Sequence, residues 1–521
     1  MSVLQIPDSR LESFSDRMNP ILVKETRQAL KSRAFVATFM LLLIASWLIC
    51  IFGTTMSGQN LEYGTPGREF FQAFYVVLSA AVLVIVPFTA YLSLLTEQNA
   101  QTYELLSITS LTPRQIVLGK LSNSIVQILV YYCAIAPFIA FTSLLQGFDL
   151  VSMVVLLVIL LATSILLCTF TLMLSTVASN RQVQTLSSLF IMGGLATAFI
   201  SILMLSFASM QQNVLSDPDF VAGMICFFVM GASYFLLFLQ ITISQLMYEA
   251  GNKSTGVRLI GTGQSLLAWG LMIATAFFFG GGIDDEVFTT VCILSLIHWA
   301  AFGFFISMER DYLSRRIRRE LPQRVALRML LVPFMPGGTR GYLLLLINLG
   351  IVLAFALVTM PMVSGLGVNE FQAILVVMLY IVAYLGLGAF MSRNLLKVST
   401  ELKPMHARTL LVVIFAFGAI VPYMILAAVG YYDRSGAGYH ILQITDPIST
   451  LNEVDQGRNP AIISLLSFAA IVGVLANLLP MIVATREIVS PDRPSPEMWE
   501  EPGEPIVVAE SPIVDATTPV E

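Results

Sequence analysis

The segment from Leu150 to Val177, LVSMVVLLVILLATSILLCTFTLMLSTV, contains no charged residue. A run of about 20 apolar residues is long enough for a helix to cross the hydrocarbon core of a bilayer. A helix that is apolar on every side has no face to turn toward water, so lipid or other apolar helices must surround it. The segment therefore predicts a membrane-spanning helix.

The composition of the whole chain extends this prediction. Of its 521 residues, 56% are hydrophobic and 12% are charged, whereas typical globular proteins carry about 25% charged residues. Apolar runs bounded by charge, Gly, Pro or Asn predict twelve spans. The runs are 34–52, 70–95, 121–145, 150–177, 186–208, 220–247, 263–280, 287–308, 341–363, 371–391, 409–431 and 462–484. The fold class is therefore all-α, a polytopic membrane protein with about twelve transmembrane helices.

The positions of Lys and Arg predict the orientation of the spans, because cations near span ends stay in the cytoplasm. With the amino terminus inside, the outward loops hold only Arg68, Arg434 and Arg458 of the 28 basic residues. An odd number of spans would place the basic stretch 310–340 outside. We therefore expect a multi-pass protein of the cell inner membrane with both termini in the cytoplasm.

The spans lack the residues that usually power or catalyse a reaction. The 28 basic and 33 acidic side chains fall in loops, tails or within about a turn of a predicted span end. Ion-coupled carriers usually need a charged group inside the membrane. The string nearest to a nucleotide-binding P-loop ends in Gly119-Lys120, but it has Arg114 and Leu121 at positions that need Gly and Ser or Thr. We expect no catalytic residues, no metal and no cofactor, and an energy source outside the lipid.

His298 is the one ionisable residue deep in a predicted span. It is either a proton relay or substrate contact, or a neutral imidazole that bonds to a neighbouring helix or pairs with aromatic rings. Buried polar groups in membranes usually take the second role, which we favour. All five cysteines also fall within predicted spans, and we expect no disulfides.

Segment 18–33, MNPILVKETRQALKSR, predicts an interfacial helix before the first span. Asn19 can cap it and Pro20 suits its first position. At 100° per residue, Lys24, Arg27 and Lys31 share one arc and the apolar residues share another. The polar arc either receives a cytoplasmic partner or only anchors the helix, and both interpretations remain open.

Segment 96–120, TEQNAQTYELLSITSLTPRQIVLGK, predicts a helical hairpin between spans two and three, with a second helix that starts at Pro113 after a Thr112 cap. It resembles the coupling segment of type-2 ATP-binding-cassette (ABC) exporter permeases, whose pattern is approximately E-x-x-x-G-T-x-E-x-L-L-x-T-P-L-S-x-x-x-I-x-x-G-K. It differs from this pattern at Gln101 and Ser110. The matching residues are Glu97, Thr102, Glu104, Leu105, Leu106, Thr109, Leu111, Thr112, Ile116, Gly119 and Lys120.

The segment before the first span resembles the connecting helix of the same family. Together the two resemblances imply that a separate cytoplasmic ABC ATPase docks on this surface. They imply contact or supporting roles for Glu97, Thr102, Glu104, Leu105, Leu106, Pro113, Gly119 and Lys120, with Lys24, Arg27 and Lys31 of the interfacial helix secondary.

The predicted organisation has five parts. They are a cytoplasmic segment 1–33, a six-span permease bundle 34–247, a linker 248–262, a second six-span bundle 263–485 and a disordered acidic, Pro-rich tail 486–521. The loop 309–340 in the second bundle does not repeat the coupling pattern, and we interpret most of its arginines as positive-inside anchors. The charges of 432–460 are expected to solvate an outward loop. The second bundle is a diverged permease half, or an addition to a permease that pairs with a second copy or a second permease.

The predicted function is therefore the membrane-spanning permease subunit of an ATP-driven ABC exporter, with the bilayer and a separate ATPase as partners and no nucleic acid. The alternative is a twelve-span, ion-coupled secondary transporter. Such carriers usually show a G-x-x-x-D-R-x-G-R-R-like loop and charged groups within spans, which this sequence lacks. A membrane-embedded transferase or protease is a third class, and the missing catalytic residues argue against it.

Overall fold

The structure is a computed structural model that describes residues 20–57, 66–99, 112–145, 147, 149–177, 181–210, 218–248, 251–279, 282–319, 321–398, 402–431, 438–459 and 461–490. Within these ranges twelve helical segments are long and apolar enough to cross a membrane, which confirms the all-α, twelve-span prediction. The second span combines α5 (Gly67–Ser79), η1 (Ala80–Ile85) and α6 (Val86–Asn99). The others are α3 (Arg33–Ser57), α8 (Pro113–Leu144), α9 (Leu150–Val177), α10 (Arg181–Ser209), α11 (Pro218–Gln245), α12 (Thr255–Phe279), α13 (Asp285–Ile306), α16 (Gly338–Thr359), α17 (Val368–Val398), α18 (Pro404–Ala428) and α20 (Ala461–Val489).

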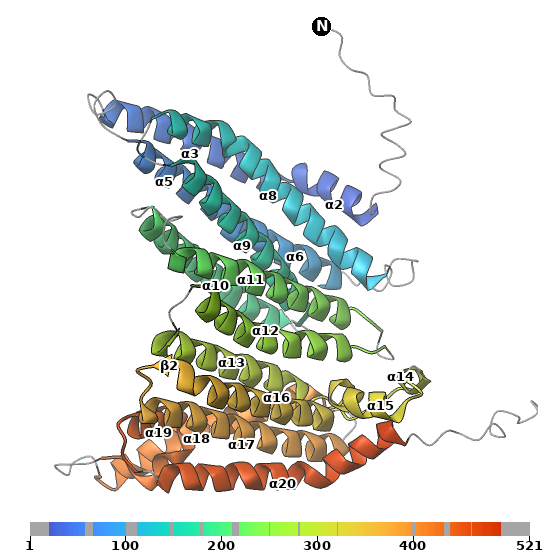
Figure 1. The fold of residues 1–521 in the computed structure, drawn as a ribbon. Coiled ribbons are helices and arrows are strands. Elements are labelled where there is room, and N and C mark those ends of the chain that lie inside the picture. Colours follow the sequence, from blue (N-terminus) through green and yellow to red (C-terminus); the bar gives the residue numbers. More distant parts are fainter. Residues whose placement is uncertain are drawn as a thin grey trace, which may run out of the picture.

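Short elements cover both ends of the spans. At one end lie α2 (Pro20–Leu30), α14 (Arg315–Arg319), α15 (Val325–Leu331) and η3 (Val332–Phe334). At the other end lie η4 (Met360–Met362), η5 (Ile441–Thr445), α19 (Pro447–Asp455) and a two-residue parallel pair, β1 (Ile283–Asp284) with β2 (Val363–Ser364). The first span begins and the last span ends at the same end of the bundle, next to α2 and α15 respectively (Figure 1).

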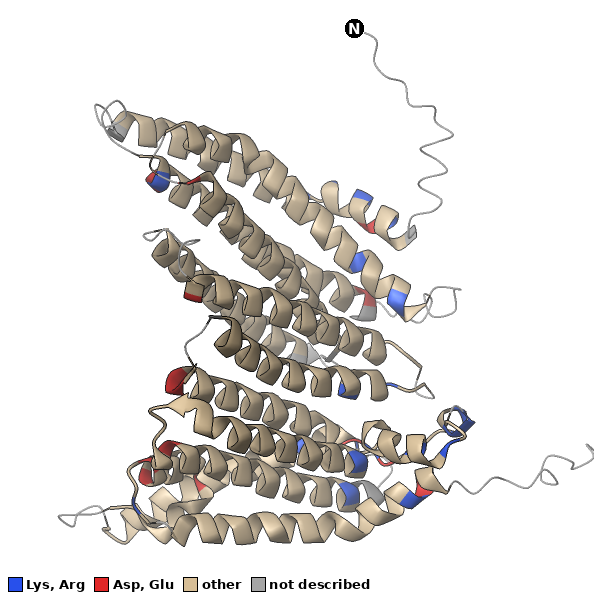
Figure 2. Cartoon of the chain, in the orientation of Figure 1, with Lys and Arg blue, Asp and Glu red and all other residues tan. Residues whose placement is uncertain are grey.

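The basic residues gather at this end. Figure 2 shows Lys and Arg along α2, at the start of α8 and α12, around α14 and at the end of α20. Arg68 and Arg458 lie at the opposite end. We call the end that carries α2 the basic end. The positive-inside rule predicts that it faces the cytoplasm.

The two largest apolar cores lie one in each half of the chain, and α11 packs against both. Phe235 and Leu239 of α11 pack against the core of the first half. Tyr234, Leu237 and Ile241 pack against the core of the second half. The core of the first half contains Phe71, Phe74, Tyr75 and Tyr131, and that of the second contains Trp269, Phe288, Trp299 and Tyr342.

The second half begins earlier than predicted, because α12 starts at Thr255, inside the expected linker 248–262. A charged residue in its first turn, Arg258, made this part of the sequence look like a loop. In the structure Arg258 is fully buried and its charge is compensated, as described below. A buried, compensated arginine does not end a helix.

His298 has the partners expected of a structural histidine. Its Nε2 lies 3.2 Å from the Gly261 carbonyl oxygen on α12. Its ring stacks on Phe302 and meets Trp299 and Tyr234 edge to face. These contacts confirm the interpretation that the imidazole bonds to a neighbouring helix among aromatic rings.

The second span contains a π-helical turn, η1, which ends at Ile85, two residues before Pro87. Pro87 has no backbone N–H to donate to the carbonyl four residues earlier, so regular α-helical bonding cannot continue through it. The Pro87 carbonyl accepts a 2.8 Å hydrogen bond from the Thr171 hydroxyl of α9. Turns of this kind often occur at functional sites, and this one borders the cavity described next.

Candidate functional site

The second arm of the predicted hairpin starts as the sequence indicates. Thr112 caps α8: its hydroxyl accepts a hydrogen bond from the Gln115 backbone N–H at 3.3 Å, and the Gln115 side chain accepts one from the Thr112 N–H at 2.9 Å. Pro113 occupies the first helical position. This reciprocal arrangement is a capping box. It confirms the predicted start of the helix.

Lys120 is the centre of the candidate site. Only 2% of its side chain is exposed, and its Nζ lies 3.0 Å from Glu97 Oε1 and 3.4 Å from Glu25 Oε1. Nζ also donates to the Ser93 carbonyl at 3.4 Å. Glu97 belongs to the last turn of α6, Glu25 to α2 and Lys120 to α8. We call Glu25, Glu97 and Lys120 the Lys120 junction, since together they connect three elements.

The Lys120 junction lies near one end of its helix. With 32 residues α8 is about 48 Å long, which exceeds the roughly 30 Å of a bilayer core. Lys120 is seven positions after Pro113, or about 10 Å along the axis. The buried ion pairs therefore lie toward the basic end, where the chain passes from membrane to water.

The predicted site residues divide into three groups. Glu97 pairs with Lys120 where α6 and α8 meet, Gly119 and Lys120 are buried, and Pro113 starts the same helix about 10 Å away along its axis. Lys24, Arg27 and Lys31 are exposed on or just after α2, as the predicted polar arc requires. Thr102, Glu104, Leu105 and Leu106 fall within 100–111, outside the described residues.

One side of α2 packs against α8. Ile21 is buried, and Glu25, which lies between the apolar and basic arcs, pairs with Lys120 of α8. The residues of the apolar arc itself are half-buried: Leu22, Val23, Thr26, Ala29 and Leu30. The ion pair therefore fixes α2 to the bundle.

A cavity of about 630 Å³ lies beside the Lys120 junction. Its walls come from α2, α3, η1, α6 and α8. Asn123, Gln127 and Tyr131 line it along α8, and the Tyr131 hydroxyl lies 2.6 Å from the Thr38 hydroxyl of α3. A mostly apolar cavity with a few polar groups is a common form of ligand site between packed helices.

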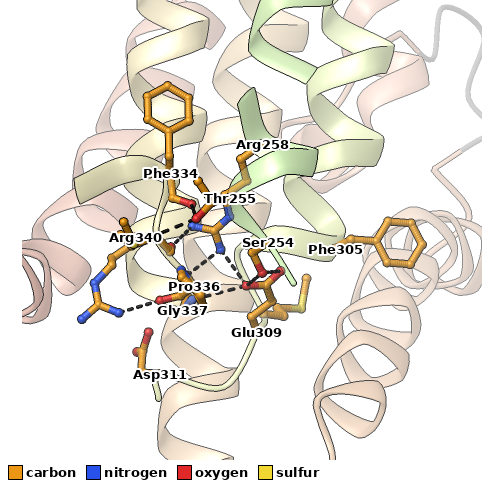
Figure 3. Close-up of polar contacts among 12 residues, drawn as sticks. Ser254, Thr255, Arg258, Phe305, Glu309, Asp311, Phe334, Pro336, Gly337 and Arg340 are labelled. Carbon is orange, nitrogen blue, oxygen red and sulfur yellow. Dashed lines mark hydrogen bonds and ion pairs between the residues drawn. The ribbon is translucent and has the colours of Figure 1, made fainter. Parts of the chain in front are cut away.

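A second buried charge cluster occupies the basic end of the second half. Arg258 donates from Nη1 to the Pro333 carbonyl at 3.0 Å, and from Nη2 to Glu309 Oε2 at 2.7 Å and the Gly337 carbonyl at 2.9 Å (Figure 3). It also bonds the Met335 carbonyl. This fully buried guanidinium thus holds the end of α13 and the loop that leads into α16.

Two further arginines secure the same loop. Arg340, at 2% exposed, pairs with Glu487 of α20. Arg328 donates to the Pro322 carbonyl at 2.6 Å and to the Val489 carbonyl at 3.3 Å. The prediction of positive-inside anchoring covers most arginines of 309–340, and these two are exceptions, because their donors bond inside the protein.

The sequence contained a usable signal for this cluster. Glu309 and Asp311 directly follow a span, and the Asp311 carboxylate accepts bonds from the Thr339 backbone N–H and hydroxyl. Carboxylates at the end of one span opposite arginines at the start of another favour ion pairing. Separations of 28 or more residues hide such pairs from local pattern analysis.

The opposite end of the second half also differs from expectation. Asp446 was expected to solvate a loop, but it is 5% exposed and caps α19 by accepting from the Ile448 and Ser449 backbone N–H groups. The Tyr423 hydroxyl donates to it at 2.9 Å. Burial alone would raise the pKa of Asp446, but these bonds and one from the Ser449 side chain hold it below its ordinary value.

This pKa shift predicts a specific loss of stability in acid. A lowered folded-state pKa stabilises the fold above the unfolded value of about 3.9, and the contribution disappears as the pH falls through the folded-state pKa. Asp446→Asn keeps a capping side chain but cannot titrate. We expect melting temperature to fall less between pH 5 and pH 3 for Asp446→Asn than for the wild type. An equal fall in melting temperature for the two proteins would show that Asp446 does not cause the loss of stability in acid.

Comparisons with protein-family models, curated proteins and solved structures find no match. Within the described residues, no group of three or more His, Cys, Asp or Glu side chains is arranged to hold a metal ion. The geometry of the Lys120 junction and its cavity is therefore the basis for assigning a function.

Proposed function

We propose that this chain is the membrane-spanning permease subunit of an ABC exporter, driven by a separate cytoplasmic ATPase. The twelve-span, all-α architecture is compatible with a transporter. The order of elements supports the finer proposal: a surface helix, a first span and then a hairpin between spans two and three. The resemblance of segments 18–33 and 96–120 to the connecting helix and coupling segment of type-2 permeases supports it as well.

The observation that carries the proposal is the Lys120 junction. Its buried ammonium bonds to a carboxylate from α2 and to one from the end of α6, while it belongs to α8 itself. The surface helix α2 and the described ends of α6 and α8, which flank residues 100–111, therefore share one buried ionic contact. A push on this surface would move α2, α6 and α8 as a unit, which is how rigid-body displacement is transmitted through packed helices.

The second half supplies a related arrangement. Arg258 at the start of α12, Glu309 after α13 and the turn before α16 meet at the basic end. In the first half a buried cation thus joins the surface helix to the second and third spans, and in the second half a buried cation joins the ends of the first three spans of that half. This supports two six-helix halves within one chain, although the loops in the two halves differ in sequence.

An ion-coupled secondary transporter is the second candidate, and one observation favours it. Two carboxylates and a lysine lie beside a cavity between spanning helices. Charged groups of this kind mark coupling routes in secondary carriers. The two candidates differ in energy source: the carrier needs an ion gradient and no partner, whereas the permease needs ATP hydrolysis by another subunit.

Lys120→Met tests the proposal. We expect vanadate-sensitive ATP hydrolysis that copurifies with the wild-type chain to fall at least tenfold, because the substitution removes the cation that joins α2 to the hairpin. The measurement is hydrolysis in nanodiscs, normalised to chain content, with Lys120→Arg included to restore part of the activity.

Arg33→Met is the matched control, since it removes an exposed charge at the same end of the bundle. It should keep the wild-type rate of hydrolysis. Unchanged hydrolysis in a folded Lys120→Met protein would contradict the role of the junction. Gradient-driven transport by the purified chain without an ATPase would select the secondary carrier instead.

A further inference from the structure

We propose that the cavity beside the Lys120 junction binds a lipophilic cation, a molecule with a positively charged head and an apolar body. The proposal of binding rests only on the cavity and the residues that line it. The additional statement that such cations are the transported cargo rests on the proposed function.

The charge of the cavity wall favours a cation. Glu25 and Glu97 are mostly buried, at 14% and 18% exposed, and both pair with Lys120. These three groups together carry a net charge of −1. Lys24 also borders the cavity, but its side chain is exposed, and water and salt screen exposed charges much more than buried ones. A bound cation would balance the buried group.

A buried amide also points to a ligand. Asn123 lines the cavity, is 6% exposed, and its Oδ1 finds no hydrogen-bond donor among the residues that the structure describes. A buried oxygen without a donor is costly, and such groups call for an explanation. The oxygen carries the negative end of the amide dipole, so a cationic group is a suitable neighbour.

The shape of the cavity explains why the ligand should also be apolar. Lys120 and Tyr131 are eleven positions apart on α8, or about 16 Å along the axis, roughly half of a bilayer core. Phe35, Ile85 and Tyr131 contribute apolar surface, and Ile85 ends the π-helical turn. The cavity is therefore charged near the basic end and increasingly apolar toward the membrane interior. An amphiphilic cation matches this gradient.

Binding can be measured on the full chain in nanodiscs, without any ATPase. Radiolabelled tetraphenylphosphonium serves as the cation and tetraphenylborate, of nearly the same shape, as its anionic counterpart. Equilibrium dialysis against empty nanodiscs should show saturable binding of about one tetraphenylphosphonium per chain and no saturable binding of tetraphenylborate.

Two substitutions assign the binding to this cavity. Ala34 lines the cavity at an exposed position of α3, so Ala34→Trp should fill the space and weaken cation binding at least tenfold without crowding the core. Ala37→Trp is the matched control, since Ala37 is exposed on the same helix but does not line the cavity. Asn123→Asp adds a negative charge and should strengthen binding about tenfold.

The proposal is overturned if both ions bind equally, if neither binds saturably, or if Ala34→Trp and Ala37→Trp behave alike. The result also separates this proposal from the previous one. Selective cation binding without ATP-dependent transport would leave the cavity assignment intact and reject the ABC mechanism. ATP-dependent transport without cation binding would leave the ABC mechanism intact and reject the cavity assignment.

Discussion

Replacing Arg258 with methionine is expected to lower the free energy of unfolding by about 3 kcal/mol or more. Methionine keeps much of the volume but leaves Glu309 without its buried partner. It also removes the guanidinium hydrogen bonds to the Pro333 and Gly337 carbonyls. Removal of one member of a buried ion pair typically costs 3–5 kcal/mol. The measurement is an SDS titration of the purified chain, followed by fluorescence of the buried Trp269 and Trp299.

Two comparison variants define the cause of this effect. Arg315→Met removes an exposed arginine from α14 and should change stability by less than about 0.5 kcal/mol. Arg258→Met combined with Glu309→Gln should recover only part of the loss, since the guanidinium bonds to the Pro333 and Gly337 carbonyls are still missing. If Arg258→Met matched Arg315→Met in stability, the buried cluster would not hold the loop.

Gly341→Ala should be the most disruptive single-methyl change in the second half. A Cβ at this position would lie 2.5 Å from the Ile306 carbonyl carbon and still closer to its oxygen, so the backbones of α13 and α16 would have to separate. Overpacking against side chains costs about 1–3 kcal/mol, and backbone yields less readily, so we expect a loss of about 3 kcal/mol. The same SDS titration measures it.

Gly350→Ala is its control within the same helix. No atom lies within 4 Å of a Cβ built at Gly350, and alanine in a helix is favoured over glycine by about 1 kcal/mol. This variant should be neutral or slightly more stable. Equal stability of the two alanine variants would mean that α13 and α16 do not approach as closely as described here.

Local patterns predicted most of the fold. Each span is a continuous apolar run, so its helix follows from composition without knowledge of its neighbours. The start of α8 follows from Thr112, Pro113 and Gln115, which lie within four consecutive residues and complete the cap among themselves. The exposed arc of α2 follows from helical periodicity for the same reason.

The ionic contacts of the site depend on tertiary packing, and this explains what sequence analysis missed. Lys120 and Glu25 are 95 residues apart, and Arg258 and Gly337 are 79 apart. A charge near a span end has the same sequence signature whether it faces water or a buried partner. For this reason the sequence predicts a linker at Arg258, positive-inside anchoring around Arg340 and a solvated loop at Asp446. In the structure all three side chains are buried.

In the function that we propose, force reaches the lipid-embedded helices from an ATPase at the basic end. The most direct test places a photoreactive amino acid at Arg114, an exposed position in the first turn of α8, and at Arg68, exposed at the opposite end. Crosslinking is performed in native membranes, and adducts are probed with azido-ATP. The account predicts a nucleotide-binding adduct from position 114 and none from 68. Absence of that adduct, together with gradient-driven transport by the chain alone, would contradict it.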